Sequence, residues 1–445
     1  MTRSQLALSL AVLAAVNAFG FMDRVMIALV AEKIKAEFLV SDFQVGLLGG
    51  TAFALVNALA SVPIARLAER WKRTYVTAGF LLLASAFTAL AGATVSFVQL
   101  VACRLGMAAG NAATEAPPHS IISDMVPPER RASAISVFML GVPIASLLGS
   151  FGGGAIAESF GWRYTFAVFG VAGGVIALLC LFVLREPARR AGMASADARP
   201  ARLSTGAVLR ILAKSPTVRF LLLGISCISL GSFGVNTFLP AFFAREHGLD
   251  AGQAGLTFGI ITGVASLIGT LAGGYGSEYL ARRDPRWLVG APALGTLVGA
   301  PVFVLGLYSP DLAIAIPVML LGSCAFYTVM GPAIATLHGS LNSYTRATGS
   351  ALFLLAMHLI GQGLGPPLIG IVSDFAANTF YGGGFLDSCA GAAAQASGSA
   401  CARASALGLR FAIALFCGFF LLGSLFLFAC ARSTQRSPPE AVAAA

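Results

Sequence analysis

The chain has 445 residues, of which 57% are hydrophobic and only 11% are charged, and its mean hydropathy is +0.83. Since a soluble domain usually carries roughly 25% charged residues, this composition excludes a protein whose surface mostly faces water. The net charge of +10 does not indicate nucleic-acid binding, because the basic residues fall in alternate loops between apolar runs.

Twelve apolar runs are long enough to cross a bilayer, for which a helix needs about 20 mostly apolar residues. The runs are continuous, whereas the strands of a membrane β-barrel alternate over about ten residues. They lie near residues 6–31, 44–65, 74–94, 97–124, 132–157, 162–184, 217–243, 254–281, 287–308, 312–338, 347–374 and 406–430. The sequence therefore predicts an all-α membrane protein with twelve transmembrane helices.

The distribution of Lys and Arg predicts the orientation of these helices. If the N-terminus is inside, most basic residues lie in cytoplasmic segments, as the positive-inside rule requires. An even number of spans then places both termini in the cytoplasm. The first run is longer than the apolar core of a signal peptide, about 7–15 residues, so it is predicted to be a permanent helix. The compact loops favour a bacterial inner membrane, and a eukaryotic organelle stays open.

Charged residues interrupt two of the runs. Asp23 and Arg24 lie in the first, and Arg104 and Glu115 lie in the fourth. A charge at the bilayer centre costs ~2.5 kcal/mol or more, and such charges usually face the bundle interior and pair. We therefore expect these four residues to meet in a cavity of the N-terminal half. Burial raises the pKa of a carboxylate and a nearby cation lowers it, and this combination can tune proton binding to near neutral pH. Asp23 and Glu115 are therefore the candidates for proton coupling. The alternative is a static cluster that braces two helices.

A polar stretch at 186–216 separates the first six runs from the last six and is predicted to be a cytoplasmic linker. It divides the chain into two six-helix halves, 1–185 and 217–433, with a flexible tail at 434–445. The halves share residues at a constant offset of 209, which indicates a duplication. The pairs are Gln44 with Gln253, Gly46 with Gly255, Ala65 with Gly274, Glu69 with Glu278 and Arg73 with Arg282. In duplicated transporters the substrate site lies between the halves, near the membrane midplane.

The loop after the second run, Ala65-Arg-Leu-Ala-Glu69-Arg70-Trp-Lys72-Arg73, combines an acid at a helix end with bases in a tight turn. Such a loop can hold two helices in one state if its bases pair with a carboxylate, for which Asp124 is the candidate. A weaker copy at 274–283 contains Glu278 and Arg282. The alternative is an ordinary basic loop on the cytoplasmic side.

This loop resembles the signature G-x-L-a-D-R-x-G-R-R of the major facilitator superfamily, with departures at Ala65, Glu69 and Lys72. Further blocks are Arg104–Asp124 with Pro127–Arg131, Gly161-Trp162-Arg163, Arg185-Glu186-Pro187 and Gly361–Asp374. Together with Asp23-Arg24 they resemble the Spinster-like branch of that superfamily. The resemblance implies a major-facilitator-type fold and secondary transport by alternating access between the halves. Organic anion–proton symporters also carry Asp-Arg in the first helix.

One position departs from the Spinster-like pattern. These proteins often carry a glutamate seven residues after the arginine of the fourth helix, and Asn111 stands there in this chain. The nearest acid is Glu115, four residues later and so on the same helix face. Either the pocket keeps its carboxylate one turn, about 5.4 Å, along the helix, or Glu115 has a different role.

The C-terminal half has few charges in its spans, so one wall of the cavity should be charged and the other largely apolar. This arrangement suits an amphiphile with a headgroup and a tail better than a sugar. The residues predicted to contact the substrate are Arg24, Arg104, Asn111, Asn236, Tyr327, His358 and Gln362. For His358 the alternative is a hydrogen-bonded packing residue.

Two further patterns concern structure. Small residues recur at every fourth position of the fifth run, which favours close helix packing; they are Gly141, Ala145, Gly149 and Gly153. Cys389 and Cys401 lie in a Gly/Ala/Ser-rich segment, 381–405, that the topology places outside, where a disulfide is possible. Two unpaired loop thiols are the alternative.

The leading hypothesis is a monomeric secondary transporter of an amphiphilic or lipid-like molecule, coupled to protons. The chain has no phosphate-binding loop of the GxxxxGK[ST] type, so ATP drive is not expected, and no cofactor or metal is implied. One alternative is a proton-linked symporter of small organic anions, with Arg24 or Arg104 holding the carboxylate. A membrane acyltransferase that uses His119 and Asp124, and a sensor that binds without transport, are more distant alternatives.

Overall fold

The computed structural model describes residues 3–127, 131–184, 186–187, 215–340, 349, 353–389 and 399–433, and these contain helices and no strand. The linker apart from 186–187 and 215–216, and the predicted tail, lie outside the described residues. In the N-terminal half the helices are α1 Arg3–Phe38, α2 Asp42–Gly49, α3 Thr51–Arg70, α4 Arg73–Ala91, α5 Phe97–Asn111, α6 Ala116–Met125, α7 Arg131–Met139, α8 Gly141–Ile144, η2 Ala145–Gly149, α9 Ser150–Phe160 and α10 Trp162–Val183.

The C-terminal half repeats this pattern of long helices with π-helical segments, labelled η. They are α12 Pro216–His247, α13 Ala251–Gly259, η3 Ile260–Val264, α14 Ala265–Leu271, η4 Ala272–Gly276, α15 Ser277–Ala281, α16 Trp287–Leu307, α17 Leu312–Tyr327, α18 Met330–Gly339, η5 Met357–Gln362, α20 Gly363–Tyr381, α21 Phe385–Ser388 and α23 Ala400–Ser433. The chain is therefore all-α, as predicted.

Eleven of the predicted runs are helices long and apolar enough to cross a membrane within the described part of the chain. The prediction of one continuous helix at 97–124 is wrong, because α5 ends at Asn111 and α6 begins at Ala116. Pro117 and Pro118 cause this break: neither has the N–H that would bond to Ala113 or Thr114 in a continuous helix. Proline is accepted in the first turn of a helix, so α6 starts there and Glu115 becomes its N-cap residue.

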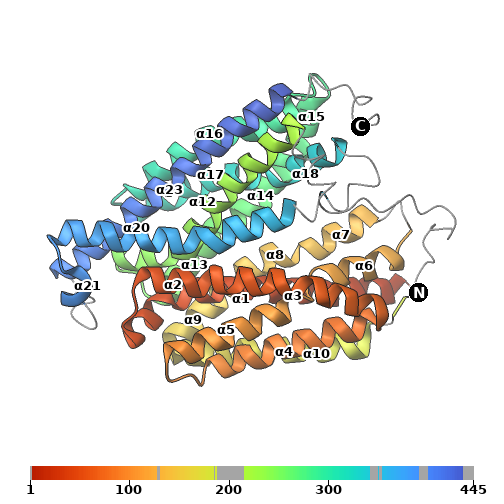
Figure 1. Cartoon of the computed structure of the whole chain (residues 1–445), viewed down its shortest axis with the longest axis horizontal. Helices are drawn as coiled ribbons and strands as arrows, with labels where there is room; N and C mark the ends of the chain where they lie inside the picture. Colours follow the sequence, from red (N-terminus) through yellow and green to blue (C-terminus); the bar gives the residue numbers. More distant parts are fainter. Residues whose placement is uncertain are drawn as a thin grey trace.

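The two halves meet at one end and diverge towards the other (Figure 1). At the end that we call the closed end, α2 packs against α20 and α9 packs against α13. The start of α1 and the end of α23 lie at the opposite, open end. Within the described residues, α6, α7, α15 and α18 pack chiefly against their own half. The molecule is therefore tight at the closed end and splayed at the open end.

Glycines bring the halves into backbone contact at the closed end. A Cβ on Gly46 would lie 2.5 Å from the carbonyl oxygen of Pro366, and one on Gly255 would lie 2.6 Å from that of Ser150. Gly46 and Gly255 are a pair of the internal repeat, so the duplication places a close helix crossing at both positions. The small residues of the fifth run also pack closely, since a Cβ on Gly141 would lie 2.5 Å from the carbonyl oxygen of Ala14.

Candidate functional site

Asp23 of α1 is buried and paired with Arg104 of α5. Arg104 Nη1 lies 2.6 Å from Asp23 Oδ2, and the exposed fractions of the two side chains are 1% and 2%. Asn111 Nδ2 donates to the same oxygen over 2.9 Å. Arg104 Nε also donates to the carbonyl oxygen of Leu48 over 3.2 Å, so the guanidinium ties together α1, α2 and α5. A buried ion pair persists only when such additional hydrogen bonds offset its desolvation.

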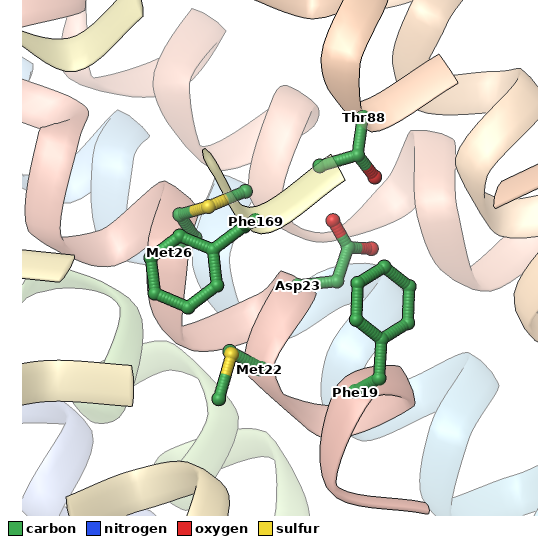
Figure 2. A pocket seen from close by; sticks show the side chains of 6 residues that line it. All are labelled: Phe19, Met22, Asp23, Met26, Thr88 and Phe169. Carbon is green, nitrogen blue, oxygen red and sulfur yellow. The ribbon is translucent and has the colours of Figure 1, made fainter. Parts of the chain in front are cut away.

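This pair is not fully satisfied. Among the described residues, Asp23 Oδ1, Arg104 Nη2 and Asn111 Oδ1 are buried without a hydrogen-bond partner. Figure 2 shows the Asp23 carboxylate facing a gap between α1, α4 and α10, which is lined by Phe19, Met22, Asp23, Met26, Thr88 and Phe169. The gap is too narrow to hold a water molecule. One oxygen of Asp23 is thus held by Arg104 and Asn111, the other has no partner, and the carboxylate borders a dry and mostly apolar space.

Arg24 belongs to a second and looser pair. Its Nη2 lies 3.7 Å from Glu115 Oε1, with 14% of the Arg24 side chain and 50% of the Glu115 side chain exposed. That distance exceeds a normal hydrogen bond, and Arg24 Nε has no partner within the described residues. The four charges expected to meet therefore form two separate pairs. Glu115 makes its contact with Arg24 from the break between α5 and α6, where it is the N-cap residue of α6.

Phe53 of α3, which was not among the residues predicted from the sequence, contacts the arginines of both pairs. The centroid of its ring lies 5.3 Å from Cζ of Arg24 and 4.7 Å from Cζ of Arg104. Both distances are within the range of a cation–π contact. The side chain is fully buried, and nothing distinguishes this phenylalanine from others in an apolar run. Only the fold shows that it contacts two guanidinium groups.

The opposite wall comes from the C-terminal half. His358 lies in the π-helical segment η5, close enough to Arg24 and Glu115 for their charges to act on it. Its Nδ1 is buried without a partner among the described residues. Asn236 of α12 donates to the hydroxyl oxygen of Tyr327 of α17 over 3.3 Å. Three of the four predicted polar residues of this half are thus a histidine near the charged wall and an amide–phenol pair within the half.

Comparisons with known proteins agree with this architecture. The family model described as Major Facilitator Superfamily matches residues 12–366. The chain belongs to this superfamily. It is 33% identical over 365 residues to the MFS-type efflux pump of Mycolicibacterium smegmatis, which covers 82% of this chain and 83% of that protein. It is 27% identical over 399 residues to Protein spinster homolog 1 of Homo sapiens, which covers 83% of this chain and 73% of that one.

A solved structure gives the same result. The crystal structure of a bacterial homolog of the human lysosomal transporter Spinster, in an inward-facing and unoccupied conformation, has a TM-score of 0.87 and 28% identity. It covers 98% of this chain and 100% of that one. This major facilitator protein is therefore a Spinster-like secondary transporter in a membrane. The acyltransferase alternative is set aside, because the chain belongs to a superfamily of transporters and matches the structure of one over nearly its whole length.

The superfamily signature loop builds an ion-pair cluster at the open end. Arg73 Nη1 lies 2.5 Å from Asp124 Oδ2, as the sequence analysis expected, and Arg73 Nε lies 2.8 Å from Glu186 Oε1. Glu186 was not among the expected partners, although it belongs to the Arg-Glu-Pro block. Its second oxygen accepts from the backbone N–H of Thr74 over 3.0 Å. The cluster ties together α4, α6 and the segment after α10.

The remaining predicted positions are simpler. The repeat copy of the signature loop, Glu278 with Arg282, is one exposed pair within a helix turn, with 3.5 Å between charged atoms. Arg70 is exposed, and the side chain of Glu69 lies outside the described residues. Gln362 is buried at the end of η5. Cys389 and Cys401 form a disulfide, with 5.5 Å between their Cα atoms.

Proposed function

We propose that this protein transports an amphiphilic, lipid-like molecule with an anionic headgroup, and that protons binding to Asp23 drive the transport. The observation that carries the proposal is the different pairing of two arginines, one buried and one partly exposed. Arg104 is committed to Asp23 at 2.6 Å, whereas Arg24 is only loosely paired at 3.7 Å. Arg104 is therefore paired with the carboxylate that would bind the proton, and Arg24 is available to bind a substrate.

The coupling step uses the Asp23–Arg104 pair. The proton would bind to the oxygen of Asp23 that has no partner, because the other oxygen is already paired with Arg104 and accepts a hydrogen bond from Asn111. Protonation removes the charge that balances Arg104, and a buried cation without its partner is costly. The contacts of Arg104 to α1 and α2 then weaken, which supplies a reason for these helices to move.

The binding step uses Arg24 and the walls around it. A phosphate or carboxylate can replace Glu115 as the partner of Arg24, since Glu115 is half exposed and can turn towards solvent. Charge-assisted hydrogen bonds of this kind are the strong ones. His358 adds a second group that can donate to an anion. The neighbouring rings of Phe21, Phe53 and Phe233 favour an apolar tail.

The orientation follows from charge and from the ends of the chain. Exposed basic residues of the signature loop, Arg66, Arg70 and Lys72, lie at the open end together with the start of α1. The positive-inside rule then makes the open end cytoplasmic. The protein would be a multi-pass protein of a bacterial inner membrane, with both termini in the cytoplasm and a monomer as the working unit.

A second candidate is efflux of a small molecule such as chloramphenicol. The 33% identity to the MFS-type efflux pump of Mycolicibacterium smegmatis favours it. A region of 281 residues is also 31% identical to the Chloramphenicol resistance protein of Streptomyces lividans. This candidate shares the fold and the coupling residue with the first and differs in the substrate.

The test is flux in proteoliposomes across an imposed pH gradient. Wild type, Asp23→Asn and the control Asp387→Asn, which changes an exposed acid at the closed end, are compared. Three panels are offered: fluorescent lysophospholipids, small carboxylates and chloramphenicol. We expect gradient-driven movement of the lysophospholipids, its loss in Asp23→Asn, and no change in the control. If only the carboxylates or only chloramphenicol move, that compound class replaces the lysophospholipids as the proposed substrate. If Asp23→Asn remains coupled to the pH gradient as wild type is, Asp23 is not the coupling residue.

A further inference from the structure

Each half presents an acid to the N-terminus of a helix in the other half. Asp374, on α20, accepts hydrogen bonds from the backbone N–H groups of Asp42 over 3.1 Å and Phe43 over 2.9 Å, the first two residues of α2. Glu158, on α9, accepts one from the N–H of Ala251 over 3.3 Å, the first residue of α13. The first N–H groups of a helix have no partner within it, so both acids act as caps from across the interface.

The two contacts are related by the internal repeat. Gln44 of α2 and Gln253 of α13 match at the repeat offset, and each completes a capping box with the residue before its helix, Ser41 or Asp250. The acids come from the partner helices of the two crossings at the closed end, α20 and α9. A helix N-terminus carries roughly half a positive charge, which favours a carboxylate there. The duplication has thus produced the same cross-half contact twice.

We propose that these two caps, Asp374 on α2 and Glu158 on α13, form one latch that holds the closed end together, and that both contacts break whenever this end opens. The latch is suited to repeated opening. Ser41 and Asp250 still cap their own helices when the acids leave. The released N–H groups can then bond to water, so α2 and α13 stay helical.

Side-chain ion pairs reinforce the stronger half of the latch. Arg245 of α12 binds both oxygens of Asp42, over 2.7 and 2.6 Å, and Ser373 Oγ donates to Asp42 Oδ2 over 2.7 Å. Glu158, by contrast, makes one backbone contact and shares its oxygen with Lys33 at 3.0 Å on the surface. The Asp374 contact should therefore contribute more to closure than the Glu158 contact.

The test is hydrogen–deuterium exchange of the whole chain in lipid nanodiscs, which requires no substrate. Asp374→Asn, Glu158→Gln and the control Asp387→Asn are compared with wild type. We expect each latch variant to speed exchange at the starts of both α2 and α13 by roughly 2- to 5-fold, the range that loss of a negative charge at a helix N-terminus produces, because the amide oxygen that replaces the carboxylate still accepts a hydrogen bond. Asp374→Asn should have the larger effect, and Asp387→Asn should have none.

The effect of Glu158→Gln on α2 decides the proposal. Glu158 contacts α13, so it can act on α2 only if the two caps open together. If Glu158→Gln speeds exchange in α13 alone, the acids are independent local caps and the latch is refuted. If neither variant changes either helix start, the contacts do not hold the closed end. If Asp374→Asn speeds exchange throughout the described helices, including α10 and α23, the variant is unfolding as a whole. The proposal then depends on whether Glu158→Gln speeds exchange at the start of α2.

Discussion

At the scale of single residues, Asp23 and Arg24 are neighbours in the chain with different environments. Asp23 faces Arg104 and Asn111 in the interior of the N-terminal half. Arg24 faces Glu115 and the C-terminal wall. Successive residues of a helix point about 100° apart, so one dipeptide serves two sites. The two arginines should accordingly respond differently to the loss of their charge.

We expect Arg104→Gln to destabilise the fold and Arg24→Gln to weaken substrate binding. Arg104→Gln leaves the Asp23 carboxylate buried without a cation, a change that typically costs about 3–5 kcal/mol, so the melting temperature in detergent should fall by several degrees. Arg24→Gln removes a loosely paired charge, so the melting temperature should stay near wild type while the KM for an anionic lysophospholipid rises roughly tenfold.

The control is Arg282→Gln, which removes an exposed arginine at the open end, and should change neither quantity. Thermal unfolding followed by fluorescence and initial rates of uptake provide the two measurements. Equal losses of stability in Arg24→Gln and Arg104→Gln would show that Arg24 is structural, and the separation of coupling and binding residues would then be wrong.

The sequence predicted which residues carry charge in the membrane, but not how they pair. Charged residues are rare in apolar runs because they are costly to bury, so Asp23, Arg24, Arg104 and Glu115 could be identified as candidates from the sequence. Their partners depend on the rotation of α5 about its axis and on the break after Asn111, which no local pattern specifies. Phe53 could not be predicted at all, because its role arises only from its position between two guanidinium groups.

At the scale of elements, the two copies of the signature loop are similar in sequence and different in structure. Arg73 binds Asp124 and Glu186 on other segments, whereas Arg282 binds only within its own helix turn, at Glu278, in the contacts described. The internal repeat therefore predicted the position of the second copy but not its role. The difference lies in the acids available nearby, since Asp124 and Glu186 have no counterpart among the matched pairs.

We expect Asp124→Asn to lower the melting temperature by several degrees and slow transport, and Glu278→Gln to leave both near wild type. Asp124→Asn takes a carboxylate from the mostly buried Arg73, which joins three segments at the open end. Glu278→Gln disrupts an exposed pair of the kind that contributes only about 0.3–0.5 kcal/mol. Comparable effects of the two variants, measured by thermal unfolding and uptake, would mean that the copies share one role.

Two adjacent glycines of α10 offer a matched test of helix packing beside the site. A Cβ on Gly173 would lie 2.2 Å from the ring of Phe19, which lines the gap beside Asp23, whereas a Cβ on Gly174 would meet nothing within 4 Å. Gly173→Ala should therefore destabilise the N-terminal half and lower gradient-driven uptake. Gly174→Ala should raise the melting temperature slightly, since alanine is favoured over glycine in a helix by about 1 kcal/mol. Equal melting temperatures would contradict this packing.

The extents of the helices could mostly be predicted from hydropathy, because each span must be long and apolar. The exception at 97–124 is instructive, since the signal for the break was present in the sequence. Two consecutive prolines, here Pro117 and Pro118, belong at the start of a helix rather than in its middle. The two prolines by themselves predict a helix that starts there, with Glu115 close to its N-cap.

At the scale of the whole molecule, the halves are joined mainly where glycines let backbones touch. Alternating access requires these contacts to form and break as units, because packed interfaces switch between discrete arrangements rather than deform. At the closed end, α2 against α20 and α9 against α13 bury the crossing points. The open end has no comparable crossing among the described elements, which leaves the closed end to set the balance between the two conformations.

We expect Gly46→Ala to shift this balance towards opening of the closed end. The added Cβ would lie 2.5 Å from the carbonyl oxygen of Pro366 across the interface, a contact that only separation of α2 and α20 relieves. Gly152→Ala is the control, because a Cβ there meets nothing within 4 Å. Spin labels at Val95→Cys and Pro310→Cys, in a chain whose six free cysteines are replaced by alanine, report the separation of the halves at this end. Gly46→Ala should add a population with longer distances that the control lacks. An unchanged distance distribution would mean that α2 and α20 accommodate the methyl group locally, and that the Gly46 crossing does not control the opening.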